Sequence, residues 1–198
     1  MAFHVEACRA ADVWDDTFLR TDPMSLKSGQ HGAGPYTTVK QIFESLGSGR
    51  GGHAPVHART DRLKLFLFPW KALVHAKEFR VFVHQGRVTA ISQQHLHSAN
   101  PLLAALPTLA ERASMVKAWA ARIVQAADKT IVPKLAGLMD SFTMDVVLEE
   151  EDNRVYFIEP NGFGAQYAAG SALFHWLKDE GKLLRTEAPS TVFVRYTI

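Results

Sequence analysis

Two neighbouring segments constrain the fold of this chain more than any other part of it. Phe142–Leu148 and Val155–Gly164 are rich in apolar residues and are separated by the polar residues 149–153. A loop of this length is common in hairpins, so we predict two antiparallel strands. Each strand nevertheless carries one acidic residue, Asp145 and Glu159, at a position where a strand favours an apolar residue. A carboxylate in a buried strand is costly unless something pairs with it, which indicates a functional role.

The expected register places these acidic residues together. If Thr143 lies opposite Glu159 and Asp145 lies opposite Phe157, period-two alternation puts Asp145, Glu159 and Asn161 on one face. The two acids are then diagonal neighbours, roughly 7–8 Å apart at the backbone. Carboxylate and amide oxygens suit Mg²⁺, so we predict a Mg²⁺ site that holds the phosphates of a nucleotide. The alternative is a plain hairpin whose acids are solvated or salt-bridged.

Composition limits the classes of protein that remain. The chain has 198 residues, of which 47% are hydrophobic and 21% charged, as is typical of a folded domain. A formal charge of +2 is too small to indicate nucleic acid by itself. The single Cys8 fits a reducing compartment, and we expect a cytoplasmic protein. We expect neither a membrane span nor a secretory signal, because no apolar run is long enough and the first residues lack a basic start.

The remaining pattern predicts an α+β protein with antiparallel sheets. Its elements, in order, are a strand over Val13–Arg20, a polar loop over residues 21–34, a helix capped by Thr37 and ended by Gly47, a strand over 62–68, a hairpin over 78–93, a helix over Leu109–Ala127, the acidic hairpin, a helix over Ser171–Lys178 and a last strand within 191–198.

The hairpin over residues 78–93 contains a candidate phosphate contact. Its two-residue turn puts Arg80 opposite Ile91 and Glu78 opposite Gln93, so Glu78, Arg80 and Gln93 are expected on one face. A guanidinium group is the usual choice for a fixed phosphate contact. The alternative is that Arg80 lies on a face of the sheet that is open to water.

The loop after Arg20 contains a second cation, Lys27, among Gly and Ser residues. Backbone amides in such a loop can cradle phosphate, and a lysine adds a mobile charge. The spacing is not that of a Walker A motif, and a lone loop lysine is usually a solvated surface residue.

Two further patterns leave alternatives open. Phe66, Phe68 and Trp70 flank Pro69 and could form the wall of an adenine site, although core packing is the better explanation for at least one of the three. His95 and His97 alternate and could share a metal ion, but the spacing places no third ligand.

Several of these motifs together resemble a known family. They are Glu78–Val83, Ala90–Gln93, Phe142–Val146, Ile158–Gly164 and Leu173–Trp176, in that order. They look like the cell division cycle 123 family, a divergent branch of the ATP-grasp superfamily. Residues 20–27 also resemble the phosphate-loop segment of small bacterial and phage ATP-grasp ligases.

The resemblance implies an ATP-grasp fold with ATP and Mg²⁺ between two lobes. The chain would be a single ATP-grasp domain, with residues 1–70 as the N-terminal lobe and hinge and residues 71–198 as the C-terminal lobe. Arg20, Lys27 and Arg80 would contact phosphate, with Arg80 and Lys27 as the catalytic cations, and Gln93 would belong to the same site. Phe66, Leu67 and Phe68 would match the strand that meets adenine. Asp145, Glu159 and Asn161 would match the Mg²⁺ ligands.

The chain departs from the family pattern in three places. Glu159 stands where the eukaryotic family has aspartate, and Gly162–Gly164 replaces Pro-Phe-Gly. Phe68 and Pro69 replace basic residues before the hinge tryptophan. The chain is also short, so we expect the N-terminal domain of an ATP-grasp ligase to be reduced.

Two functions follow from the resemblance. The first, which we expect, is an ATP-dependent ligase, in which ATP phosphorylates a carboxylate and a nucleophile then attacks the acyl phosphate. The second is an ATP-binding assembly chaperone for a translation initiation factor or another protein, as in the eukaryotic relatives. The sequence leaves the acceptor or partner unidentified, and a pI near 8.7 permits an RNA partner without indicating one.

Overall fold

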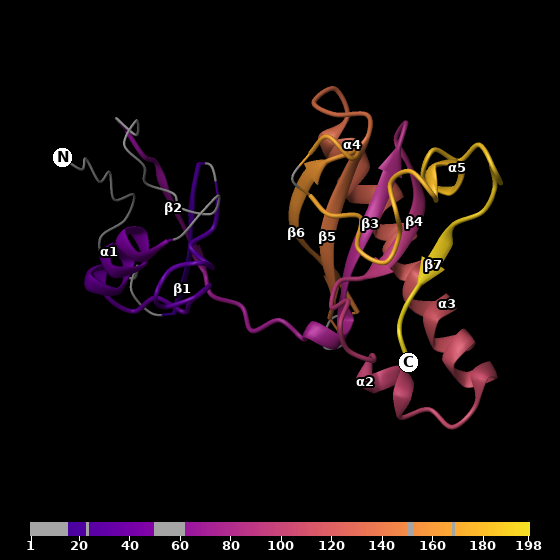
Figure 1. The fold of residues 1–198 in the computed structure, drawn as a ribbon, viewed down its shortest axis with the longest axis horizontal. Coiled ribbons are helices and arrows are strands. Elements are labelled where there is room, and N and C mark those ends of the chain that lie inside the picture. The colour runs from indigo at the N-terminus through magenta and orange to yellow at the C-terminus, as the bar shows by residue number, and fades with distance from the viewer. Residues whose placement is uncertain (1–15, 23, 50–61, 150–152, 168) are drawn as a thin grey trace. The chain divides into compact units, whose positions relative to one another are not determined.

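The computed structural model describes residues 16–22, 24–49, 62–149, 153–167 and 169–198. The chain divides into two compact units, Met1–Ala72 and Leu73–Ile198. Each unit has its own sheet and its own hydrophobic core (Figure 1).

The N-terminal unit consists of a two-stranded antiparallel sheet and one helix. Strands β1 (Thr17–Thr21) and β2 (Leu65–Pro69) pair along their length, and α1 spans Val39–Ser48. Leu19 of β1 lies in a core with Ile42 and Leu46 of α1, and Leu67 of β2 packs against it. The expected strand over Val13–Arg20 is therefore present at its end, and Val13–Asp15 lie outside the described residues.

Helix α1 begins one residue later than predicted. A capping box pairs the N-cap residue with the residue three positions after it, and here these residues are Thr38 and Gln41. The Thr38 side chain accepts a hydrogen bond from the backbone N–H of Gln41, and the Gln41 side chain accepts one from the N–H of Thr38. Thr38, not Thr37, is the N-cap, and the helix continues past Gly47 to a C-cap at Gly49.

The C-terminal unit is built on a five-stranded sheet with the order β6-β5-β3-β4-β7 (Figure 1). The strands are β3 (Glu78–His84), β4 (Arg87–Gln93), β5 (Phe142–Leu148), β6 (Val155–Gly162) and β7 (Phe193–Arg195). Strand β7 pairs parallel to β4, so the expectation of purely antiparallel sheets is wrong at this edge. The α+β class and both hairpins are as predicted.

Helix α3 (Leu109–Ala126) covers one face of this sheet (Figure 1). Its Trp119 ring lies 5.6 Å from the ring of Phe79 on β3. The helix continues as a π-helical turn over Ala127–Ile131 and a short helix α4 (Val132–Leu135), so it does not stop before Pro133. The widened turn lets the N–H of Val132 reach the carbonyl of Ala127. Three shorter helical segments are η2 (His75–Lys77), α2 (Pro101–Ala104) and α5 (Glu180–Leu183).

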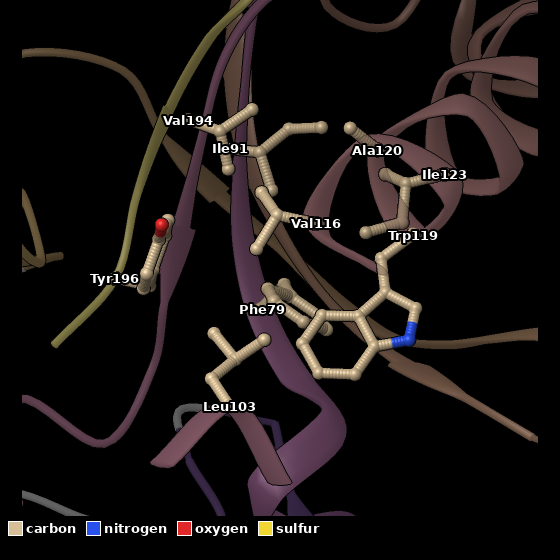
Figure 2. A pocket seen from close by; sticks show the side chains of 9 residues that line it. All are labelled: Phe79, Ile91, Leu103, Val116, Trp119, Ala120, Ile123, Val194 and Tyr196. Carbon is tan, nitrogen blue, oxygen red and sulfur yellow. The ribbon is translucent and has the colours of Figure 1, made fainter. Parts of the chain in front are cut away.

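The seam between α3 and the sheet encloses a small apolar cavity of about 10 Å³ (Figure 2). Its walls include Phe79, Ile91, Val116 and Trp119. A cavity of this size and lining is a packing defect, since a bound water needs polar partners and at least this much space.

Two β-bulges change the predicted registers. The turn at Gln85–Gly86 has positive φ at both residues, as a two-residue hairpin turn requires, but a bulge at Thr89 places Arg80 opposite Ser92 instead of Ile91. In the second hairpin the turn pairs Leu148 with Val155 instead of Arg154, and a bulge at Ile158 adds a second residue of displacement, so that Asp145 lies opposite Glu159 instead of Phe157.

The segment Ser171–Lys178 consists of turns, and the predicted helix there is wrong. Ala172 has φ +52°, and Phe174 is buried against Phe82 of the sheet with their ring centroids 5.5 Å apart. Tertiary packing therefore overrides the local helical pattern, and the helix α5 begins only at Glu180. Among the described residues, no helix has the length and apolar character to cross a lipid bilayer.

Candidate functional site

The face of the C-terminal sheet opposite α3 carries polar side chains at its centre. Residues opposite each other in an antiparallel pair share a face, and β3 and β5 pair Arg80 with Asp145 while β5 and β6 pair Asp145 with Glu159. Thr143 and Asn161 form the next pair along β5 and β6. Asp145, Glu159 and Asn161 therefore share one face, as the sequence predicted.

Asp145 and Glu159 are direct neighbours and not diagonal ones. The observed register differs from the predicted one by one residue at the turn and by one more at the bulge. A total displacement of two residues keeps every side chain beyond the bulge on its predicted face, because side chains alternate with period two. Phe157 lies before the bulge, opposite Val146, and packs against the α3 core instead of sharing the face of Asp145.

Arg80 and Asp145 form a bidentate ion pair at the centre of this face. Arg80 Nε donates to Oδ1 of Asp145 at 2.9 Å, and Nη2 donates to Oδ2 at 2.7 Å. The remaining nitrogen, Nη1, donates to the carbonyl of Gly170 at 2.7 Å. The two side chains are 11% and 6% exposed, so each ion depends on the other for its stability in the protein.

Three carboxylates act on the single guanidinium. Burial lowers the pKa of Arg80, but the hydrogen bond with Asp145 and the charges of Asp145, Glu159 and Glu78 outweigh it and raise this pKa above its ordinary value. Burial raises the pKa of Asp145, opposed by Arg80 and reinforced by the charges of Glu159 and Glu78. The charges of Asp145, Glu159 and Glu78 therefore all act on the Arg80 guanidinium.

Two buried polar atoms beside Asp145 have no hydrogen-bond partner among the described residues. They are Oγ1 of Thr143 and Nδ2 of Asn161. Buried polar groups are nearly always paired in native proteins, so these two atoms have capacity to bind a ligand or a water. The amide of Asn161 can also turn its oxygen toward a cation, since oxygen and nitrogen occupy equivalent positions in this group. The donor set of two carboxylates and one amide fits Mg²⁺.

The loop after β6 is tied to the polar face at separate points. Its Gly170 carbonyl binds Arg80, and the N–H of Leu173 donates to Oγ of buried Ser92 at 3.0 Å. Further along, Arg195 of β7 donates to both carboxylate oxygens of Asp179, at 2.7 and 2.6 Å. These contacts hold the segment between β6 and α5 over the sheet.

Sequence reasoning missed the roles of Ser92, Asp179 and Arg195. None of them lies in a pattern that points to chemistry, because a serine in a strand and an acid before a short helix are common. Their partners are distant in sequence, and only the pairing of β4 with β7 brings Arg195 beside Ser92.

The predicted position of Gln93 is wrong. The bulge pairs Gln93 with Phe79, which places it on the face of α3 and away from Arg80. The side chain is buried, and its amide nitrogen Nε2 donates to the carbonyls of His95 and Ser98 and to the hydroxyl of Thr197. Gln93 therefore organises the loop after β4.

The other predicted nucleotide contacts lie in the N-terminal unit. Arg20 lies opposite Phe66 on the outer face of the β1–β2 sheet, where Phe66 and Phe68 are 44% and 47% exposed. Leu67 points to the opposite face and packs against the core. Lys27 is exposed in the loop after β1. The aromatic side chains are thus available to a ligand, which core packing would have prevented.

The fold and the polar face define an α+β protein with an acid-rich, arginine-centred site on one sheet. A sequence model of the D123 family matches residues 40–194, and the chain belongs to this family.

Individual relatives agree with this assignment. The chain is 30% identical over 161 residues to a protein of Lodderomyces elongisporus described as a translation initiation factor eIF2 assembly protein. That alignment covers 76% of this chain and 37% of the relative, so the chain spans well under half of the relative's length. Cdc123 from Schizosaccharomyces pombe has a similar fold, with a TM-score of 0.64 and 17% identity over 92% of this chain and 72% of that one. Its C-terminally truncated form gives a TM-score of 0.61 and 18% identity over 90% and 71% of the two chains.

The buried ion pair generates a stability prediction. Asp145→Leu and Arg80→Met should each lower the free energy of unfolding by about 3 kcal/mol, because each leaves an uncompensated charge in the protein. The double variant should lose clearly less than the sum of the two. Urea denaturation of the four proteins in this cycle measures the coupling, and additive losses would contradict the pairing.

The Asp179–Arg195 pair generates a pH prediction. The hydrogen bond from Arg195 is the main cause that lowers the pKa of Asp179. The contribution of this pair to the stability of the protein is therefore present above the ordinary aspartate pKa and is lost as the pH falls through the lowered value. Asp179→Asn should destabilise the protein by about 1–3 kcal/mol at pH 7, and this difference should shrink below about pH 4. The exposed neighbour Glu180 provides the control, since Glu180→Gln should change little at either pH. A difference for Asp179→Asn that is independent of pH would rule out the ionised pair as its cause.

Proposed function

We propose that this chain is an ATP-binding assembly factor that acts on a protein partner, with Mg-ATP bound at the polar face of the C-terminal sheet. The observation that carries the nucleotide site is the convergence of the charges of Asp145, Glu159 and Glu78 on Arg80, on a sheet whose other face forms the apolar core. Buried acids of this kind are retained against a cost in stability, which favours a functional reason for them.

Asp145, Glu159 and Asn161 would hold the metal ion in this proposal. Mg²⁺ bound there would neutralise phosphate oxygens and orient the nucleotide. Arg80 now donates to both oxygens of Asp145, so nucleotide binding would let the guanidinium exchange this carboxylate for a phosphate. The carbonyl of Gly170 would keep Arg80 oriented during the exchange.

The N-terminal unit carries further candidate contacts for a nucleotide. Arg20 and Lys27 are candidates for phosphate, and Phe66, Leu67 and Phe68 form the strand that would meet adenine. Side chains alternate on β2, with Leu67 in the core and two exposed phenylalanines. The adenine ring could therefore stack on the aromatic rings, and Leu67 would offer only its backbone groups to the edge of the base. In this proposal the chain has an ATP-grasp fold.

The family favours assembly of a protein complex over ligation. The Lodderomyces relative is described as an eIF2 assembly protein, and we propose a translation initiation factor, eIF2 or an equivalent, as the partner here. An ATP-dependent ligase with the same site would instead transfer phosphate to an acceptor carboxylate, with Arg80 and Lys27 as the catalytic cations. The two functions differ in turnover, because an assembly factor uses ATP to stabilise a binding surface.

Calorimetric titration with ATP tests the nucleotide site. Binding should depend on Mg²⁺, and Asp145→Asn combined with Glu159→Gln should weaken it by at least about 100-fold, since two charged ligands are lost. Glu159→Gln alone keeps the Arg80–Asp145 pair and should already weaken Mg²⁺-dependent binding.

The matched control for this titration changes the same charges elsewhere. Asp128 and Glu180 are both exposed, and Asp128→Asn combined with Glu180→Gln should bind Mg-ATP as the unaltered chain does. Circular dichroism verifies that each variant is folded. Equal affinity in the site and control variants would disprove the proposed metal ligands.

Pull-down with purified eIF2 tests the partner. The chain should retain more eIF2 with Mg-ATP than without nucleotide, and the Asp145→Asn, Glu159→Gln variant should lose this increase. Phosphate release measured in the same mixtures separates the two functions. Stoichiometric complex with little release supports assembly, whereas sustained release of ADP and phosphate without a stable complex would favour the ligase.

A further inference from the structure

Three side chains at one end of the C-terminal sheet converge in a way that the nucleotide site does not use. They are His75 in η2, Glu78 at the start of β3 and His95 just after β4. Nδ1 of His75 and Nε2 of His95 each lie 3.4 Å from the same oxygen of Glu78, Oε2. The two imidazole rings meet edge to face, with their centroids 4.7 Å apart.

These separations match those of ligands around one divalent ion. Zn²⁺ binds His nitrogen and carboxylate oxygen at about 2.0–2.2 Å, so two ligands of a tetrahedral site lie roughly 3.3–3.5 Å apart. All three candidate ligand atoms lie within 4.8 Å of one another. Only small side-chain rotations would bring the imidazoles to a common ion.

The backbone around the cluster is held by buried polar side chains. Gln93 Nε2 donates to the carbonyl of His95, and Nδ2 of buried Asn100 donates to the carbonyl of Ala76, next to His75, at 2.8 Å. The N–H of Gln94 also donates to the carbonyl of Glu78 at 3.0 Å. The segments that carry the two histidines are therefore fixed to the same sheet end, which lowers the cost of ordering them around an ion.

We propose that His75, Glu78 and His95 form a binding site for Zn²⁺ or a similar divalent transition metal. Two imidazoles and one carboxylate suit a borderline metal and not Mg²⁺, which prefers oxygen ligands alone. The side chains of His75 and His95 are 74% and 46% exposed, so an ion has access from solvent and a fourth position stays open to water or a ligand. His95 is thus paired with His75 from another segment, and not with His97 as the sequence alternation allowed.

The site would clamp the start of the C-terminal unit to the sheet. His75 precedes β3, whereas His95 follows β4, so a shared ion would join the two ends of the β3–β4 hairpin. Glu78 contributes to the electrostatic surroundings of Arg80 and Asp145. A cation on Glu78 would therefore remove one of the carboxylates that act on the nucleotide face.

Competition with a colorimetric zinc chelator tests the site on the full chain after metal removal. One equivalent of Zn²⁺ should bind, and His75→Ala, His95→Ala and Glu78→Gln should each weaken binding by at least about tenfold. Loss of a residue that only orients a metal ligand already lowers metal affinity by about this factor, and loss of the ligand itself should lower it at least as much. Substitution with Co²⁺ should give the visible absorption of a four-coordinate ion in the unaltered chain and lose it in these variants.

The chain offers two controls. His97 is exposed and lies two residues beyond His95 in the same loop, so His97→Ala should leave zinc affinity unchanged. The Asp145→Asn, Glu159→Gln variant should change zinc affinity by much less than about tenfold, because it removes only neighbouring charge and no proposed zinc ligand. Equal zinc affinity in His75→Ala, His95→Ala and His97→Ala, with each variant folded by circular dichroism, would overturn the proposal, as would binding of less than one equivalent by the unaltered chain.

Discussion

The buried ion pair between Arg80 and Asp145 is the interaction on which the polar face depends. It joins β3 to β5 at the centre of the sheet, and both side chains are almost completely removed from water. Removing either partner would leave a charge without compensation, whereas an apolar pair of similar volume would often be as stable or more so. Stability alone therefore does not explain why these residues are charged. The neighbouring Glu159 and Glu78 add negative charge around the same guanidinium, which is consistent with a site that exchanges one charged partner for another.

The opposite face of the same sheet offsets the free-energy cost of burying the Arg80–Asp145 ion pair. Phe79, Val81, Met144 and Val146 alternate with the polar residues along β3 and β5 and form the core with α3. Burial of such side chains contributes about 1.5–3 kcal/mol each, so the apolar face can offset the desolvation of one ion pair. The two faces thus divide the tasks: one stabilises the domain, and the other presents charge. Phe82, Ala90 and Phe174 form a separate apolar cluster.

The structure shows where the chain's departures from the family pattern lie. Glu159, where the eukaryotic family has aspartate, follows directly after the bulge at Ile158. A bulge re-aims the neighbouring side chains, so a longer acid there can still direct its carboxylate to the position beside Asp145. The His75–Glu78–His95 cluster lies at the start of the motif that resembles the family, yet only Glu78 belongs to that motif. The two histidines come from the flanking segments.

The sequence by itself determined the elements whose signals are local. Period-two alternation predicted β3, β4 and β5 with the observed bounds, and helical spacing predicted α3, because backbone geometry repeats within a few residues. It also determined that Glu159 and Asn161 share a face, since they are two residues apart on one strand, whereas Asp145 lies on that face because the displacements at the turn and at the bulge add to two residues. The tertiary structure decided the bulges at Thr89 and Ile158, and with them the partner of Arg80 and the position of Gln93. It also decided the turns over Ser171–Lys178 and the meeting of His75 with His95. These features depend on contacts between residues distant in sequence, whose energies no local pattern records.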